Sequence, residues 1–209
     1  MNIFINISGV YEEEGFSVTD GVSLDLKDLE GSCCYCDSDA EEAIRKAISP
    51  LPVSGIHWID TGDYHYISKL WMEKIQEPFA LVLFDNHPDD QDGAFGGMLS
   101  CGNWVKAARE MLPFMKADYR NTADIAAGLP AYLSIDLDVL SRQYARTDWD
   151  QGAMTLDGLI SCISRISAGH RIIGADICGG LTEGKGAKAE DLAVNARTRK
   201  VLADYMSKG

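Results

Sequence analysis

The stretch "ALVLFDNHPDDQ" (residues 80–91) changes abruptly from five apolar residues to an almost wholly polar segment. Residues 80–84 predict a strand that is buried on both faces, as in a parallel sheet. One histidine and four aspartates then follow within eight residues: Asp85, His87, Asp89, Asp90 and Asp92. Carboxylates packed this closely repel one another unless they are solvated or face a positive charge. The stretch therefore predicts either an acidic loop or a cation site at the end of a buried strand.

Strand-like and helix-like segments alternate along the rest of the chain. Apolar runs predict strands at 2–8, 55–60, 79–85, 131–140 and 171–178, and residues 22–26 and 118–126 are candidates for further short strands. Helical periodicity predicts helices at 38–49, 66–75, 103–116, 155–167 and 189–208. This alternation predicts an α/β fold with three layers, in which helices cover both faces of a mostly parallel sheet.

Length and charge restrict the class of protein. A chain of 209 residues without repeats or linkers predicts a single domain over residues 1–209. A net charge of -13 argues against partners that are nucleic acids or anionic membranes. No apolar run has the length of a membrane span, and residues 1–15 lack the features of a signal peptide. We therefore expect a cytoplasmic protein whose six cysteines are thiols.

Chemistry-bearing residues follow several of the predicted strands. Parallel sheets bind ligands just beyond the carboxyl ends of their strands, and those ends lie at one edge of the sheet. Acidic or imidazole side chains occupy such positions after four strands: Asp60, Asp63 and His65; Asp85, His87 and Asp89; Asp136 and Asp138; and Asp176. A solvated surface with aspartates as helix caps is the alternative explanation for either acidic motif alone.

Two of these motifs favour a metal site when they are taken together. Asp85, His87 and Asp89 alternate, so they share one face of an extended segment, and Asp136 and Asp138 do the same. Buried aspartates are rare unless they are paired or bind a metal. Two divalent cations would carry +4 against the -4 of four aspartates. Oxygen-rich ligation with imidazole suits Mn²⁺ better than a structural zinc ion, which prefers thiolates.

The motifs resemble those of the ureohydrolases, the family of arginase, agmatinase and formiminoglutamase. "FDNHPD" (84–89) resembles the family's D-x-H-x-D motif, and "SIDLD" (134–138) resembles its S-x-D-x-D motif. "TGDYHYIS" (61–68) is similar, with one inserted residue, to G-G-D-H-S, and "GADIC" (174–178) resembles the D-I stretch near the end of the core. The order and approximate spacing agree over residues 55–180.

The resemblance implies the three-layer fold of the arginase/deacetylase superfamily and a site for two Mn²⁺ ions. It implies that Asp85 and Asp136 bridge the two ions. Carried over residue by residue, the full set of metal ligands is His65, Asp85, His87, Asp89, Asp136 and Asp138.

Departures from the family pattern are equally informative. Ser141 and Arg142 stand where ureohydrolases continue their motif with D-P. Gly179 replaces the glutamate that grips a guanidinium, and Val105 replaces the histidine that assists proton transfer. The ligand set is retained while the groups that recognise guanidine are lost. The sequence therefore indicates a compact, uncharacterised branch of this family rather than an arginase.

Other residues are candidates for contacts with the substrate. Cys33 and Cys36 could form a redox pair or could be buried or pocket-lining thiols. "LSCGNW" follows the metal loop, and "TDWDQGAM" (147–154) stands where ureohydrolases carry a substrate loop, which could also be a simple turn. The candidates are Cys33, Cys36, Cys101, Asn103, Trp104, Asp150 and Gln151, with Asp89 or Asp90 as the catalytic proton-transfer group.

Together these observations predict a binuclear Mn²⁺-dependent hydrolase that cleaves a non-peptide C–N bond, in an amidine or an amide, of a small polar molecule. One alternative is a deacetylase-like enzyme with a single Zn²⁺ or Fe²⁺. The other is a catalytically inactive metal- or ligand-binding protein on the same fold. The sequence leaves the oligomeric state open.

Overall fold

A seven-stranded parallel sheet forms the centre of the molecule. The computed structural model describes residues 1–19 and 21–207. The strand order is β2-β1-β4-β9-β8-β5-β7, and every neighbouring pair is parallel. The strands are β1 (Asn2–Asn6), β2 (Gly21–Asp25), β4 (Ile56–Ile59), β5 (Phe79–Phe84), β7 (Met115–Arg120), β8 (Ala131–Asp136) and β9 (Ile172–Cys178).

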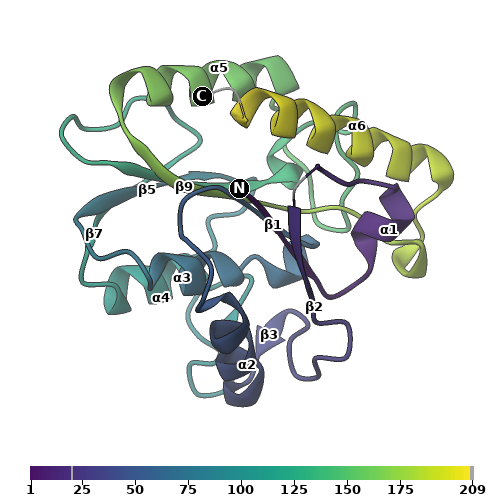
Figure 1. The fold of residues 1–209 in the computed structure, drawn as a ribbon, viewed down its shortest axis with the longest axis horizontal. Coiled ribbons are helices and arrows are strands. Elements are labelled where there is room, and N and C mark those ends of the chain that lie inside the picture. The colour runs from purple at the N-terminus through teal and green to yellow at the C-terminus, as the bar shows by residue number, and fades with distance from the viewer. Residues whose placement is uncertain (20, 208–209) are drawn as a thin grey trace.

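Helices cover both faces of this sheet, as predicted (Figure 1). On one face, α5 (Leu156–Gly169), α6 (Ala189–Met206) and the short α1 (Val10–Glu14) enclose one apolar core. On the other, α2 (Ser38–Ile48), α3 (Ile67–Met72) and α4 (Trp104–Met111) enclose a second core. Three 3₁₀ turns complete the helical elements: η1 (Gly62–Tyr64), η2 (Leu137–Val139) and η3 (Glu183–Lys185). The predicted three-layer α/β fold is confirmed.

The order of strands explains why the polar motifs meet. β4, β9, β8 and β5 are consecutive neighbours in the sheet, although they are far apart in sequence. Because they are parallel, the residues that follow their carboxyl ends lie at the same edge. The segments that carry His65, Asp85 and Asp136 are therefore brought together by strand pairing alone.

Several predicted boundaries need correction. The helix predicted at 103–116 ends at Met111, and residues 115–120 form strand β7 instead. Pro113 cannot continue a helix, so it separates the two elements. The strand predicted at 131–140 ends at Asp136, whose side chain accepts a hydrogen bond from the Asp138 N–H and starts the 3₁₀ turn η2. The end of the predicted helix 189–208 lies outside the described residues.

A small antiparallel pair was not predicted. β3 (Tyr35–Cys36) pairs with β6 (Leu99–Ser100) as a separate two-stranded sheet. Two-residue strands leave too little periodicity to be recognised in a sequence. This pair brings the segment of Cys33 and Cys34 beside the segment of Cys101, whose N–H donates to the Cys34 carbonyl.

A buried ion pair joins the two ends of the described chain. Arg199 of α6 donates from Nε to Oε2 of Glu14 in α1 at 2.7 Å, and both side chains are fully buried. The same guanidinium donates to the carbonyl of Gly179, the residue after β9.

Over the described residues, no helix has both the length and the apolar character needed to cross a membrane.

Candidate metal centre

The six predicted ligands lie together at the carboxyl edge of the sheet. His65 follows the turn η1 after β4, and its side chain is buried. Asp85 and Asp89 follow β5, and Asp136 and Asp138 end β8 and enter η2. The carboxyl groups are all buried, and His87 is the exception, with a side chain that is 34% exposed. Four buried carboxylates in one place require positive charge.

Five of the six predicted ligands form two groups that share the carboxylate of Asp85. Asp136 lies in a third group, with His65 and Cys178. In the first, Nδ1 of His65 lies 3.1 Å from Asp85 Oδ2 and 3.2 Å from Asp89 Oδ2. In the second, Nδ1 of His87 lies 2.8 Å from Asp138 Oδ2 and 3.7 Å from Asp85 Oδ1. Within each group the donor atoms lie within 4.8 Å of one another. Asp85 thus points one oxygen into each group, as a bridging carboxylate would.

The pKa values of these carboxyl groups reflect their crowding. Burial and then the charge of Asp85 raise the pKa of Asp136 to about 6. Burial and then the charge of Asp136 raise the pKa of Asp138 to about 9. A hydrogen bond with Asp85, opposed by partial burial, raises the pKa of His87 to about 9. Without a cation the cluster therefore retains protons in place of the missing positive charge.

A hydrogen-bond relay orients His65. Its Nε2 lies 2.9 Å from the hydroxyl of Ser134, which donates at 2.7 Å to Oδ1 of the buried Asp176. Because the hydroxyl hydrogen is used on Asp176, Ser134 accepts from Nε2–H of His65. Nδ1 then faces the carboxylates. Burial lowers the pKa of His65, but the surrounding acidic groups raise it well above its usual value, so Nδ1 holds a proton that a bound cation would replace. Ser134 is the first residue of the "SIDLD" motif.

Three further groups hold the carboxylates in place. The indole N–H of Trp104 donates to Oδ2 of Asp89 at 2.6 Å. The backbone N–H of Asn86 donates to Oδ1 of Asp138 at 2.9 Å. The buried thiol of Cys178, which is not among the predicted site residues, lies 3.0 Å from Oδ2 of Asp136. Cys178 belongs to the quoted "GADIC" motif, so its place in the motif was the available signal.

A cavity of about 170 Å³ opens onto these ligands. Trp149 forms one wall, with its ring 6.0 Å from that of His87. Neither Trp149 nor Cys34 was predicted to line it. The cavity is lined by Cys34, Tyr35, Gly62, Gln91, Ser100, Cys101, Gly102 and Trp149, together with His65, Asp85, His87, Asp89, Asp136 and Asp138.

Among the predicted substrate contacts, Cys101 lines this cavity and Cys33 lies exposed beside it. Trp104 is fully buried; its indole N–H donates to Asp89, and its ring lies 4.8 Å from that of His65. Cys36 packs into the core beneath β3, because its side chain points inward from the strand. Along the described chain, neither Trp104 nor Cys36 belongs to the cavity lining.

Four other predicted residues make local contacts instead. Asn103 bonds to the backbone of Ser100 and Met98. Gln151 donates to the carbonyls of Leu140 and Ala145, which makes it a brace for its own loop. The exposed Asp150 accepts a hydrogen bond from Asn86 through its backbone, and Asp90 faces Arg109 at 3.6 Å. In the part of the chain that the structure describes, these residues lie outside the cavity lining.

The position of the missing glutamate is sterically closed. Gly179 has a φ of 97°, and a Cβ atom there would lie 2.6 Å from Oδ1 of Asp136. Val105, at the position of the missing histidine, is buried in α4. At Gly179 the packing leaves no room for a side chain, and at Val105 the side chain is enclosed in the core.

Comparison with protein families found no family that matches this sequence. An uncharacterised protein from Thermotoga maritima is 28% identical over 195 residues, which cover 84% of this chain and 78% of that protein. This similarity carries no functional information.

Solved structures resemble the whole chain. A hypothetical agmatinase from Burkholderia thailandensis has a TM-score of 0.65 at 15% identity, covering 99% of this chain and 85% of its own. An arginase from Medicago truncatula has a TM-score of 0.66 at 13% identity, covering 99% and 86%. A formimidoylglutamase from Bacillus subtilis has a TM-score of 0.65 at 13% identity, with the same coverage of 99% and 86%. The chain therefore has the arginase-like α/β/α fold, as the sequence motifs implied.

Proposed function

We propose that this protein is a hydrolase that uses two divalent cations, most simply Mn²⁺, to cleave an amidine or amide C–N bond in a small polar molecule. The observation that carries the proposal is the pair of His/Asp groups that share Asp85 on a fold of this class. A site for a single cation, as in a deacetylase-like enzyme, would leave one of these groups without a role.

The donor set fits two hard or borderline cations. His65, Asp85 and Asp89 would hold one ion, and Asp85, His87 and Asp138 the other. The family resemblance adds Asp136 as a second shared carboxylate. Oxygen donors with one imidazole per ion suit Mn²⁺. When bound, such a pair would supply Lewis acidity and lower the pKa of a bound water molecule, so that hydroxide is available at neutral pH.

The residues of this chain would have separate tasks around that centre. The Ser134–Asp176 relay keeps Nδ1 of His65 directed at the carboxylates. Trp104 fixes Asp89 by a buried hydrogen bond, and we retain Asp89 as the group that passes a proton to the leaving amine. Asp90 drops out of this role because it faces Arg109 outside the cavity. Trp149 lines the cavity and would contact the bound substrate.

The cavity restricts the class of substrate. Its volume of about 170 Å³ accommodates a small molecule and not a folded partner. Gly179 and Val105 leave it without the carboxylate and the imidazole that the resemblance assigns to guanidine chemistry. A buried guanidinium without a carboxylate partner is costly. We therefore favour a neutral or zwitterionic substrate.

The test is a screen of guanidino, amidino and N-acyl compounds with the Mn²⁺-loaded protein, read by release of ammonia, urea or amine. Asp136→Asn is the control, since it removes a shared carboxylate. We expect turnover of at least one amidine or amide that depends on Mn²⁺ and is lost in the variant. Metal analysis of the loaded protein should give two ions per chain. Two bound ions with no turnover of any compound class would favour a catalytically inactive binding protein instead.

A further inference from the structure

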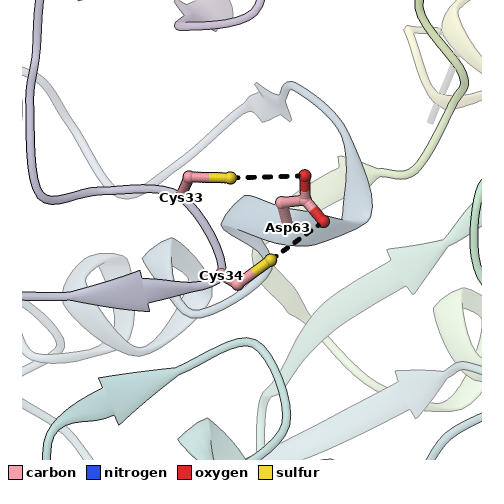
Figure 2. Close-up of side chains that lie close together, drawn as sticks. All are labelled: Cys33, Cys34 and Asp63. Carbon is pink, nitrogen blue, oxygen red and sulfur yellow. Dashed lines mark hydrogen bonds between the residues drawn. The ribbon is translucent and has the colours of Figure 1, made fainter. Parts of the chain in front are cut away.

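Two thiols and one carboxylate meet beside the cavity, which Cys34 lines. Sγ of Cys33 lies 3.7 Å from Oδ2 of Asp63, and Sγ of Cys34 lies 3.3 Å from Oδ1. Figure 2 shows both side chains directed at the same carboxyl group. The three donor atoms lie within 4.8 Å of one another. They share no member with the His/Asp groups that contain Asp85.

The backbone makes this convergence possible. Adjacent side chains of an extended strand point to opposite sides, so consecutive cysteines normally diverge. Here Cys34 has a φ of 59°, and the Tyr35 N–H donates to the Cys33 carbonyl at 2.6 Å. The resulting tight turn brings both sulfur atoms to one side. A left-handed conformation at a residue other than glycine carries an energetic cost.

The surroundings of Asp63 suit a cation with two thiolate ligands. Asp63 is only 2% exposed, and it also accepts a hydrogen bond from the Trp149 indole at 3.2 Å and pairs with Lys185. Lys185 also pairs with Asp148, so the one ammonium is shared between two carboxylates. A divalent cation would offset the charge of the two thiolates and leave that arrangement unchanged.

Access and ligand chemistry point to one type of ion. Cys33 is exposed, so an ion can enter from solvent, while Cys34 lines the cavity. Thiolate ligands select Zn²⁺ and other thiophilic ions, whereas the oxygen-rich His/Asp groups suit Mn²⁺. The two sites would thus differ in metal preference within one cavity.

We propose that Cys33, Cys34 and Asp63 form a binding site for Zn²⁺ or a similar thiophilic divalent cation. This site is separate from the His/Asp centre. The ion would join the loop before β3 to the turn η1, which immediately precedes His65. Through this link it would hold one wall of the cavity and the entry to one predicted ligand. The proposal does not depend on the proposed hydrolase function.

The experiment is a titration of the reduced protein with Cd²⁺, followed by thiolate-to-cadmium charge-transfer absorption and by metal analysis. We expect a saturable band in the unmodified protein that is absent from C33S/C34S, together with the loss of one bound equivalent. C33S alone, at an exposed position, should also lose most of the band, and circular dichroism checks that each variant is folded.

Two control variants separate this site from the His/Asp centre. C178S removes the thiol beside Asp136 and should keep the band, and C162S removes a half-exposed thiol of α5 and should also keep it. Asp136→Asn should reduce Mn²⁺ binding and leave the Cd²⁺ band intact. A band that survives in folded C33S and C33S/C34S, or one that disappears in C178S, would overturn the proposal.

Discussion

Gly179 stands so close to Asp136 that the two positions constrain each other: a Cβ atom on Gly179 would lie 2.6 Å from the carboxylate oxygen Oδ1 and 2.8 Å from the Leu137 nitrogen. Ureohydrolases are expected to carry a glutamate at this position. The position of Asp136 therefore leaves no room for a glutamate at position 179, and a side chain restored there would displace Asp136.

Replacement of Gly179 should weaken metal binding by more than backbone strain alone explains. We expect Gly179→Ala to weaken Mn²⁺ binding, because the methyl group would push Asp136 away. Gly128→Ala is the matched control, since Gly128 has the same φ of 97° with nothing within 4 Å of its Cβ position. Backbone strain alone costs on the order of 1–3 kcal/mol in both variants. Calorimetric titration with Mn²⁺ should separate them, and equal Mn²⁺ affinities would contradict this account.

Arginine and agmatine should be poor substrates. No carboxylate is available from position 179 to pair with a guanidinium, and an unpaired buried charge costs on the order of several kcal/mol. Urea release with saturating Mn²⁺ is the measurement. Turnover at rates ordinary for a ureohydrolase would mean that another acidic residue binds the guanidinium.

Removal of divalent cations should lower the melting temperature. The buried carboxylates Asp85, Asp89, Asp136 and Asp138 repel one another without a counter-charge. A ligand that binds only the folded state stabilises it by mass action. Thermal melts with and without a chelator should differ for the unmodified protein and differ less for Asp136→Asn. Identical melts would mean that these carboxylates bind no cation and are neutralised by protons instead.

The stabilisation by Mn²⁺ should increase with pH. Burial raises the pKa of Asp136 to about 6 and that of Asp138 to about 9, and a hydrogen bond with Asp85 raises the pKa of His87 to about 9. The metal-free folded state therefore holds protons that the unfolded chain has already lost. Stability of the metal-free protein should therefore fall as pH rises through these values. Cation binding releases the same protons and strengthens with pH. The shift in melting temperature caused by Mn²⁺ should thus be larger at about pH 8.5 than at about pH 6, and a pH-independent shift would exclude this coupling.

The relay behind His65 should contribute to affinity without touching the ion. Ser134→Ala removes the group that accepts from Nε2–H, and such supporting contacts typically account for about 10–100-fold in metal affinity. Ser167→Ala, on the surface of α5, is the control. Competition with a chromogenic chelator measures both. An unchanged affinity in Ser134→Ala would show that His65 is oriented by packing alone.

The cluster of acidic and imidazole side chains can be predicted from sequence because its signals are local. Asp85 and Asp136 each follow a long apolar run, and parallel strands bring such residues to one edge. The cavity wall was less predictable, since Trp149 and Cys34 reach it from loops whose conformation depends on tertiary contacts. Cys36 was predicted to line the cavity but points into the core, a choice set by the register of the two-residue strand β3.

Helix α4 illustrates the remaining limit. Its apolar periodicity continues past Met111, and only the proline at 113 signals the change to strand β7. Asp90 likewise shares the acidity of its neighbours in "NHPDD", but the positive φ of 48° at Asp89 turns the chain so that Asp90 faces Arg109. Backbone turns of this kind depend on tertiary contacts, which the local sequence does not indicate.

The ion pair between Glu14 and Arg199 has a consequence for how the protein is made. These residues are separated by 185 positions, and Arg199 also holds the carbonyl of Gly179, which abuts Asp136. On the ribosome, Glu14 emerges long before its partner, and a buried carboxylate without that partner is unfavourable. Closure of the glycine turn against the ligand cluster must therefore wait until α6 has been synthesised. Capture of metal ions should follow the synthesis of α6 rather than precede it.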